Sequence, residues 1–287
     1  MFTIATFYKF FSFPDYAERR MGLLAECQRL QVKGTILLAE EGINGTIAGS
    51  RGAVDDLLAY LRTDPRMADL SHRESQAEEP PFERLKVKLK REIVTMGVPQ
   101  VSPTQQVGTY VSPEAWNALL QDPEVLVLDT RNEYEVDIGT FHRAQNPHTH
   151  SFREFPDYVK THLDPSQHKK IAMFCTGGIR CEKASSFLLS QGFSEVYHLK
   201  GGILNYLETV PTQESLWQGE CFVFDERVAV QHGLEAGTHE MCWGCGHPIT
   251  EEDRRSPQFE EGISCPHCYA DLTPEKRAKL AQRPRKI

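Results

Sequence analysis

The chain has 287 residues, of which 40% are hydrophobic and 25% are charged, and its formal net charge is −8. This length predicts two or three domains, with a sizeable core in at least one of them. The negative charge excludes a basic field over the whole protein, so any contact with RNA must use local basic patches.

The cysteine content and the hydropathy pattern predict a cytoplasmic location. The chain has eight cysteines. It shows no recognisable signal peptide, and its apolar runs are far too short to span a membrane. Eight cysteines in a chain without either feature indicate a reducing compartment. We therefore expect a cytoplasmic protein that does not enter a membrane.

Residues 1–92 predict a ferredoxin-like domain of the acylphosphatase-like type. Strands are expected over 2–11, 32–38, 46–48 and 82–89, and helices over 14–30 and 52–62. The segment 40–45 is predicted to be a turn because of its glycines, and the polar segment 71–81 is predicted to be a loop. The resulting order is β-α-β-β-α-β, which hosts many functions and therefore indicates none by itself.

Two features of this first domain are candidates for contact with RNA. A positive face is expected on its last strand, from Lys86, Lys88, Lys90 and Arg91. Aromatic stacking surfaces are expected near the N-terminus, from Tyr8, Phe10 and Phe11. The alternative is a solvated strand face and an ordinary packed core, because charges alternate on any half-exposed strand.

Residues 93–107 are predicted to be a linker, and residues 108–215 are predicted to be an α/β domain with a parallel sheet. Strands are expected over 125–129, 171–174 and 196–199, and helices over 113–120, 155–162 and 183–191. Chemistry in such a fold belongs at the carboxyl ends of the strands. Asp129 and Cys175 both occupy such ends.

The segment around Cys175 predicts a buried strand, a tight loop and the N-terminus of a helix. Backbone N–H groups and the positive end of the helix dipole favour a thiolate there, which is the nucleophilic form of cysteine. The expected cradle for an anion is formed by Thr176, Gly177, Gly178 and Ile179. Arg180 adds a permanent positive charge. The alternative is a buried structural cysteine at the end of a strand.

Three further residues are expected to support this loop. Cys181 lies six positions after Cys175 and is either a resolving thiol for an oxidised Cys175 or a small residue that packs in the helix. Asp129 and Arg131 are expected to position the loops through an ion pair rather than to take part in the chemistry.

Residues 216–287 are expected to form a small cysteine-knuckle segment with a basic tail. Two Cys-x-x-Cys pairs provide four possible metal ligands, which are Cys242, Cys245, Cys265 and Cys268. Their spacing is typical of structural zinc, and four thiolates leave no open position for catalysis. A redox pair and unligated thiols are the alternatives.

The tail carries a cluster of basic residues, namely Lys276, Arg277, Lys279, Arg283, Arg285 and Lys286. In an acidic protein, such a cluster predicts either an arm that binds phosphates or a disordered solubilising tail.

The central domain resembles a rhodanese domain. The resemblance rests on LVLDTRNEYE from Leu126, on CTGGIR from Cys175, and on LKGGI from Leu199. It implies a cysteine that carries a persulfide in a loop of backbone N–H groups. The stretch Gly139-Thr-Phe-His-Arg-Ala144 departs from the Gly-His-Ile-Pro-Gly-Ala that is usual in that family.

Nearly the whole chain resembles the bacterial rhodanese-domain tRNA uridine-34 hydroxylase family. Four ordered motifs carry this resemblance: AEEGINGTIAGSR, CTGGIRCEKAS, LKGGILNYLE and CFVFDERVAV. The resemblance implies an oxidoreductase that converts the wobble uridine of tRNA to 5-hydroxyuridine, with tRNA as its partner and molecular oxygen as co-substrate.

A hypothesis for the chemistry follows from the thiol. The Cys175 thiolate would add to C6 of uracil, so that C5 becomes enolate-like and able to react with oxygen. Arg180 and the loop N–H groups would stabilise the negative charge. The sequence has no dinucleotide fingerprint, so neither a flavin nor a nicotinamide cofactor is expected. The alternatives are a persulfide-carrying sulfurtransferase and a non-enzymatic module that binds tRNA or senses redox state.

Overall fold

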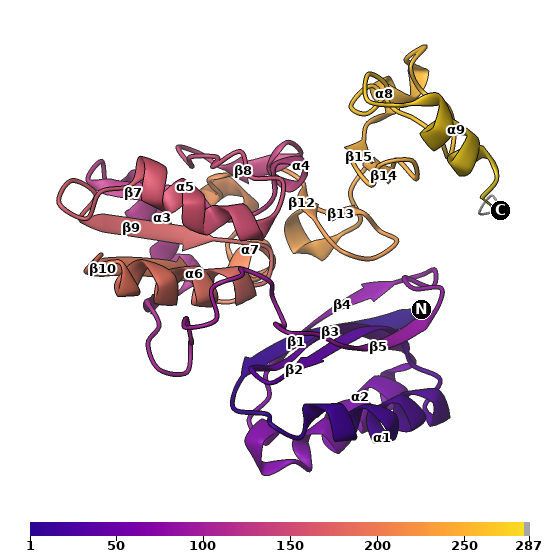
Figure 1. Cartoon of the computed structure of the whole chain (residues 1–287), viewed down its shortest axis with the longest axis horizontal. Coiled ribbons are helices and arrows are strands. Elements are labelled where there is room, and N and C mark those ends of the chain that lie inside the picture. The colour runs from indigo at the N-terminus through magenta and orange to yellow at the C-terminus, as the bar shows by residue number, and fades with distance from the viewer. Residues whose placement is uncertain (284–287) are drawn as a thin grey trace.

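The computed structural model describes residues 1–283 of the chain. Its described residues form a five-stranded N-terminal sheet, a four-stranded central sheet and three two-stranded sheets (Figure 1). Two of the small sheets lie within the C-terminal segment, and the third pairs a strand of that segment with a strand of the central part. Within residues 1–283, no helix has both the length and the apolar character needed to cross a membrane.

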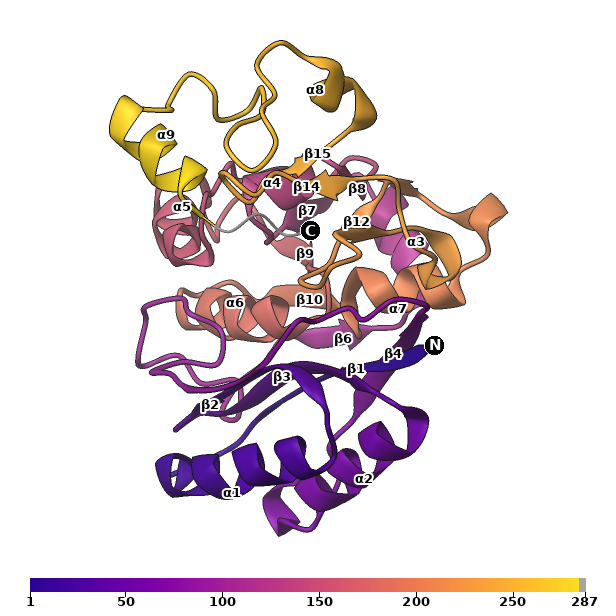
Figure 2. The same cartoon turned by 90° about the vertical axis from the view of Figure 1, so that its right-hand side faces the viewer.

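The N-terminal sheet has the strand order β4-β1-β3-β2-β5. Its elements and helices are β1 (Phe2–Phe10), α1 (Tyr16–Arg29), β2 (Lys33–Ala39), β3 (Gly42–Gly49), α2 (Arg51–Arg62), β4 (His72–Ala77) and β5 (Leu85–Leu89). Helices α1 and α2 cover one face of this sheet, and the opposite face is turned toward the central part of the chain (Figure 2). One face is therefore left for a site.

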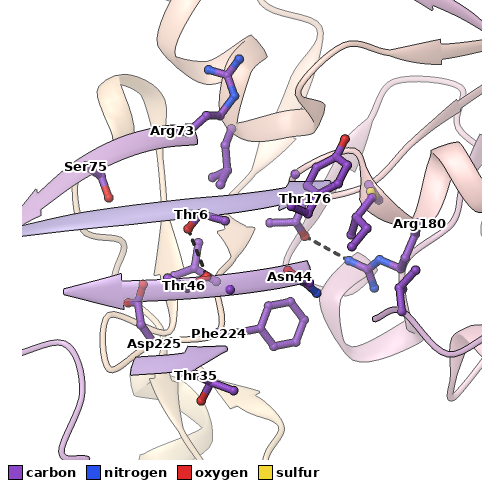
Figure 3. A pocket seen from close by; sticks show the side chains of 18 of the residues that line it. Thr6, Thr35, Asn44, Thr46, Arg73, Ser75, Thr176, Arg180, Phe224 and Asp225 are labelled. Atoms are coloured by element: carbon purple, nitrogen blue, oxygen red, sulfur yellow. Dashed lines mark hydrogen bonds between the residues drawn. The ribbon is translucent and has the colours of Figure 1, made fainter. Parts of the chain in front are cut away.

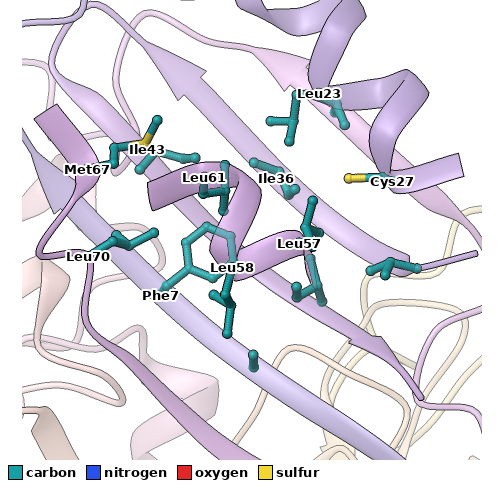
Figure 4. Close-up of a cluster of buried hydrophobic side chains, with 14 of the residues drawn as sticks. Phe7, Leu23, Cys27, Ile36, Ile43, Leu57, Leu58, Leu61, Met67 and Leu70 are labelled. Atoms are coloured by element: carbon teal, nitrogen blue, oxygen red, sulfur yellow. The ribbon is translucent and has the colours of Figure 1, made fainter. Parts of the chain in front are cut away.

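The core of this part lies between the sheet and its two helices (Figure 4). Helix α2 begins after Ser50, whose hydroxyl accepts a hydrogen bond from the Ala53 N–H. Its buried side chains recur at helical spacing and pack against the strands; they are Val54, Leu57, Leu58 and Leu61. The apolar periodicity read from the sequence therefore reports the face that is buried.

One prediction for the end of this domain was wrong, namely the loop before its last strand. The sequence predicts a loop over 71–81, whereas the structure places β4 at His72–Ala77, antiparallel to β1. The strand expected over 82–89 is the shorter β5, a fifth strand added parallel to β2. Strand β4 lacks an apolar pattern because it is an edge strand, and its residues Arg73, Glu74 and Ser75 line a cavity instead of a core.

The prediction for the turn over 40–45 was also too long. Only Glu40 and Glu41 separate β2 from β3, and Gly45 pairs with Phe7 inside the sheet. A Cβ atom on residue 45 would lie 2.9 Å from the Phe7 ring. Glycine is therefore required here by close packing rather than by a turn. As a consequence, Asn44 lies within a strand, on the open face of the sheet.

The central sheet is entirely parallel, with the strand order β6-β10-β9-β7. Its elements and those packed around it are β6 (Thr109–Val111), α3 (Pro113–Gln121), β7 (Val125–Asp129), α4 (Glu133–Val136), β8 (Gly139–Phe141), α5 (Phe155–His162), β9 (Lys170–Phe174), α6 (Ile179–Ser190), β10 (Glu195–Leu199) and α7 (Gly202–Thr209). The expected α/β architecture is confirmed.

Both faces of the central sheet are covered by helices, which explains its continuous apolar strands. In β9, Ile171 and Met173 join the core beneath α5 and α6, while Ala172 and Phe174 join the core beneath α3 and α7. The segment 93–107 has no strand or helix, and its Met96 is buried against the first of these cores. This segment is thus packed on the central part rather than freely solvated.

The C-terminal segment consists of short elements. They are β11 (Trp217–Gly219), β12 (Cys221–Phe222), β13 (Ala229–Val230), β14 (Glu240–Met241), β15 (Pro248–Ile249), α8 (Glu251–Arg255) and α9 (Pro274–Ala281). Strand β11 pairs with β8, and this pairing buries Phe141 among the aromatic rings of Phe174, Tyr206 and Trp217. The stretch that departs from the usual rhodanese sequence is therefore well packed. Arg285 and Lys286 lie outside the described residues.

Candidate active site

A cavity of about 470 Å³ lies between the open face of the N-terminal sheet and the loop that carries Cys175 (Figure 3). Its size falls within the range of about 300–1,000 Å³ that is usual for small-ligand sites. Its lining comes from many parts of the chain, among them the N-terminal sheet, the loop after β9 and the segment that follows β12. The cavity thus exists only because segments far apart in the sequence are brought together.

Cys175 lies at the junction that the sequence predicts, between the end of β9 and the start of α6. The residue is fully buried from bulk solvent but lines the cavity. The Gly178 N–H donates to the Cys175 Sγ at 3.1 Å. Gly178 has a φ of 100°, and a Cβ on it would lie 2.9 Å from the Tyr8 hydroxyl, so a side chain is disfavoured there on two grounds.

The environment of Cys175 favours the thiolate. Burial raises the pKa of this thiol, but a hydrogen bond from Cys181, the charge of Arg180 and the N–H groups of Cys181 and Gly178 outweigh it. Together they lower the pKa of Cys175 to about 6. A large fraction of the sulfur is therefore nucleophilic at neutral pH, as the sequence predicts.

Arg180 has a partner that the sequence analysis did not identify. Its guanidinium forms a bidentate ion pair with Glu135, with Nη1–Oε2 and Nη2–Oε1 distances of 2.6 Å and 2.7 Å. Arg180 also donates to the Thr176 hydroxyl at 3.2 Å, which holds the first residue of the loop. The buried Glu135 carboxylate balances the positive charge of Arg180, so the attraction between Arg180 and the thiolate is confined to short distances. The same contacts hold the loop in shape.

Asp129 and Arg131 form the ion pair that the sequence predicts. Arg131 Nη2 lies 2.6 Å from Asp129 Oδ2, and both side chains are fully buried. Arg131 also donates to the carbonyl oxygens of Glu135 and Gly139, and its guanidinium lies 5.2 Å from the Trp217 ring centroid. Neither residue lines the cavity. The pair therefore holds the segment that carries Glu135.

Cys175 and Cys181 are both free thiols. Burial and the neighbouring Cys175 sulfur raise the pKa of Cys181 well above its ordinary value, so this thiol stays protonated. Its Sγ lies 3.5 Å from the Thr130 hydroxyl. Cys181 is thus placed to donate to the Cys175 sulfur, while its service as a resolving thiol stays a prediction.

A second polar cluster borders the loop. The Tyr8 hydroxyl donates to Glu182 Oε1 at 2.8 Å, although Tyr8 lies in β1 and Glu182 in α6. Burial raises the pKa of Glu182, and the same cause raises the pKa of Tyr8. Tyr8 lines the cavity, and its hydroxyl is held by the bond to Glu182. Of the other two aromatics expected to stack on bases, Phe10 is buried and Phe11 packs against Phe13.

The cationic residues predicted to meet RNA lie in two places. Lys86 and Lys88 pair in register with Thr35 and Leu37 of β2, so they share the sheet face that lines the cavity. Lys90 and Arg91 follow β5 and are exposed. Far along the chain, α9 carries the exposed Lys276, Arg277 and Lys279, of which Arg277 is paired with Glu260.

The four C-terminal knuckle cysteines converge on one point. All four Sγ atoms lie within 4.8 Å of one another, and the distances from Cys265 Sγ to Cys245 Sγ and Cys268 Sγ are both 3.9 Å. A tetrahedral zinc with Zn–S bonds of about 2.3 Å separates its sulfur ligands by about 3.8 Å. The cluster therefore fits a four-thiolate metal site, as predicted from the spacing.

Most residues that line the cavity were not predicted as site residues, among them Asn44, Arg73 and Phe224. Asn44 falls in the predicted turn over 40–45 and Arg73 in the predicted loop over 71–81, while Phe224 belongs to one of the four family motifs. The only hint at position 224 is an aromatic residue followed directly by charged residues. Asn44 and Arg73 carry no local signal, because their roles depend on which sheet face is left open.

Two family models match the chain. The UPF0176 acylphosphatase like domain matches residues 2–93, and the Rhodanese-like domain matches residues 112–209. Among solved structures, the rhodanese-like domain of an Anabaena sp. protein is 20% identical, covering 38% of this chain and 78% of that one with a TM-score of 0.33. An acylphosphatase from Coxiella burnetii is 13% identical, covering 30% of this chain and 90% of that one with a TM-score of 0.23.

A curated relative extends the similarity to nearly the full length. The tRNA uridine(34) hydroxylase of Picosynechococcus sp. is 60% identical over 279 residues, which is 97% of this chain and 94% of that protein. The resemblance drawn from the four ordered motifs is confirmed. This identity and coverage show that the chain belongs to the tRNA uridine(34) hydroxylase family.

Proposed function

We propose that this protein is an enzyme that hydroxylates uridine at the wobble position of tRNA to 5-hydroxyuridine, with molecular oxygen as co-substrate and Cys175 as nucleophile. The observation that carries the proposal is an activated thiol opening into a cavity of about 470 Å³. The name of the 60% identical relative supports the choice of substrate.

The first chemical step is addition of the Cys175 sulfur to C6 of the base. The C5–C6 π electrons move toward C5 and the C4 carbonyl, which makes an enolate that reacts with oxygen to give a C5 hydroperoxide. The Gly178 N–H bonds the sulfur before it attacks. The Tyr8 hydroxyl holds a proton near the loop, since burial raises its pKa well above the ordinary value, and it donates a hydrogen bond to Glu182.

The second oxygen atom leaves as water, and that step consumes two electrons. A thiol supplies them: it takes one oxygen from the hydroperoxide, becomes a sulfenic acid and then a disulfide with a second thiol. Loss of the C5 proton and departure of the Cys175 sulfur from C6 restore the double bond and yield 5-hydroxyuridine. Cys181, whose thiol is hydrogen-bonded to the Cys175 sulfur, is a candidate for that thiol.

Zinc is proposed as a structural ion held by Cys242, Cys245, Cys265 and Cys268. When bound, the ion would cross-link two knuckles whose small core contains Ile249 and three of the four cysteines. All four ligands are thiolates, so the ion has no open position for substrate. The residues around it therefore stabilise the segment and take no part in the chemistry.

The test of the function is a comparison of Cys175→Ala with Cys27→Ala. Cys27 is a buried thiol in the N-terminal core, where burial raises its pKa to about 12. Cys27→Ala is therefore a matched control that removes one unreactive thiol. Each variant is incubated aerobically with unmodified tRNA and a thiol reductant, and the nucleosides of the tRNA are then measured by mass spectrometry. Product is expected with Cys27→Ala and not with Cys175→Ala. Equal product from both variants would end the proposed role of Cys175.

A second candidate function is transfer of sulfur from a Cys175 persulfide. The match of residues 112–209 to the Rhodanese-like domain favours it, as does the N–H cradle around the sulfur. The discriminating measurement is formation of thiocyanate from thiosulfate and cyanide in the absence of tRNA. Rapid turnover without tRNA, combined with no 5-hydroxyuridine under oxygen, would replace the hydroxylase proposal with this one.

A further inference from the structure

The cavity above Cys175 has an amide on its sheet wall and an exposed aromatic ring on another wall. We propose that it receives a single unstacked uracil base, which Asn44 recognises at N3–H and Phe224 holds by stacking. This inference rests on the proposed function and adds the means by which uridine is selected over cytidine.

Asn44 has the orientation needed for an acceptor. It lies in β3 between Ile43, which is part of the core, and Gly45, where a Cβ would point at the core residues Phe7 and Ile36, so the Asn44 side chain projects from the open face into the cavity (Figure 3). The Asn44 Nδ2 donates to the Ile93 carbonyl oxygen at 3.0 Å. Because a carbonyl oxygen can only accept, this bond sets the amide orientation and leaves Oδ1 for the cavity.

An amide oxygen in this place distinguishes the two pyrimidines. Uracil carries a hydrogen on N3 and donates there, whereas the N3 atom of cytosine is an acceptor. Cytosine would therefore set a lone pair against Asn44 Oδ1 and leave both groups unsatisfied inside a partly enclosed cavity. N3 also lies across the ring from C6, so a bond at N3 leaves the C5–C6 edge free for the Cys175 sulfur.

Phe224 has the exposure and the support of a stacking platform. Its side chain is 60% exposed although it is large and apolar, and it lines the cavity beside Asn44 and Thr35 (Figure 3). Its ring packs edge to face on the buried Phe222, with centroids 5.1 Å apart. Enzymes that modify a base extrude it from the stack and hold it against such rings.

The segment that carries Phe224 is pinned to the sheet. Asp225 accepts two side-chain hydrogen bonds from Arg227, at 2.8 Å and 2.7 Å. Arg227 in turn donates to the Ser75 hydroxyl of β4 at 2.9 Å. The ring is thus held over the open face before any base arrives, which lowers the entropic cost of binding.

The experiment measures binding of two RNAs under anaerobic conditions. The probes are a fluorescent anticodon stem-loop with uridine at the wobble position and the same RNA with cytidine there. Wild-type protein is expected to bind the uridine RNA about tenfold more tightly, the ratio for one unpaired buried polar group. Asn44→Ala should reduce this ratio to about twofold or less, since the discriminating acceptor is gone.

Matched variants separate the two roles. Gln76→Ala removes an exposed amide of β4 that does not line the cavity and should keep the wild-type ratio. Phe224→Ala should weaken binding of both RNAs by about tenfold and leave the ratio of their affinities unchanged. Phe224→Tyr, which keeps an aromatic ring, should restore the affinity for both RNAs. Urea unfolding of each variant confirms that the fold is intact.

The outcomes distinguish this inference from the proposed function. A wild-type protein that binds both RNAs equally, or an Asn44→Ala variant that keeps the ratio, overturns the assignment of Asn44 even if 5-hydroxyuridine is produced. A wild-type protein that discriminates through Asn44 but produces no 5-hydroxyuridine refutes the proposed reaction and supports the base pocket.

Discussion

Lys183 connects the two sides of the cavity, and its loss is expected to loosen them. The residue lies in α6, one helical turn beyond the Cys175 loop, with a side chain only 1% exposed. Its Nζ contacts Glu41 Oε2 at 2.7 Å, Glu92 Oε2 at 2.5 Å and the Val94 carbonyl oxygen at 3.0 Å. Replacement by Met keeps the volume and removes the charge, which leaves two carboxylates facing one another.

The magnitude follows from the burial of the three partners. Removing one partner of a fully buried ion pair costs about 3–5 kcal/mol. The Glu41 and Glu92 side chains retain 23% and 17% exposure, so some hydration compensates them. We therefore expect Lys183→Met to lower the free energy of unfolding by about 3 kcal/mol. With a urea m-value of about 3 kcal/mol/M, the unfolding midpoint falls by about 1 M.

The dependence on pH has a definite sign. Burial raises the pKa of Glu92, but the Lys183 hydrogen bond, the Met96 N–H and the Lys183 charge outweigh it and lower that pKa. Stability from such a group is present above the pKa of the unfolded state and is lost as the pH falls through the folded value. The difference between wild type and Lys183→Met should therefore shrink in acid.

The assay is urea unfolding followed by circular dichroism, with Lys160→Met as the matched control. Lys160 lies 3.8 Å from Asp157, and both side chains are largely exposed, so this variant should stay within about 0.5 kcal/mol of wild type. A Lys183→Met variant as stable as Lys160→Met at neutral pH would refute the argument that this buried cluster joins the two parts.

Three other predictions concern the thiol, the metal and the RNA surface. The rate of Cys175 alkylation by iodoacetamide should rise with pH around a midpoint near 6, because the thiolate forms as the pH passes that pKa; a midpoint near that of an ordinary thiol, about 8.5, would contradict the activated sulfur. Purified protein should contain about one zinc per chain, and a chelator should destabilise the C-terminal segment while leaving the N-terminal sheet folded; metal-free protein prepared under reducing conditions with the same stability would count against the site. Lys86→Glu and Lys88→Glu should each weaken binding of tRNA and lower the salt slope by about one, whereas an unchanged slope would remove this face from the RNA path.

Local signals in the sequence were enough to locate the nucleophile and its loop. Apolar residues up to Phe174, followed by a cysteine and two glycines, define a strand end and a helix start, and the structure has both. Ser112 and the following proline define the start of α3 in the same way. The spacing of the two Cys-x-x-Cys pairs predicted that their sulfurs would converge, and they do. In each case the determining contacts lie within a few residues or within one known motif.

The tertiary structure alone decided what surrounds the thiol. Glu135 meets Arg180 across 45 positions of the sequence, and Tyr8 meets Glu182 across 174. Strand β4 could not be predicted because its polar side chains face a cavity, so the apolar alternation that marks a strand is missing.

By itself, the sequence determined an activated cysteine in an α/β domain, a four-cysteine knuckle and the family. It could not determine the cavity, because a wall made from β3, the Cys175 loop and the Phe224 segment depends on which face of the N-terminal sheet the central part covers. That choice is made by long-range packing and by ion pairs such as Lys183 with Glu41. Such contacts leave no periodic trace in the chain.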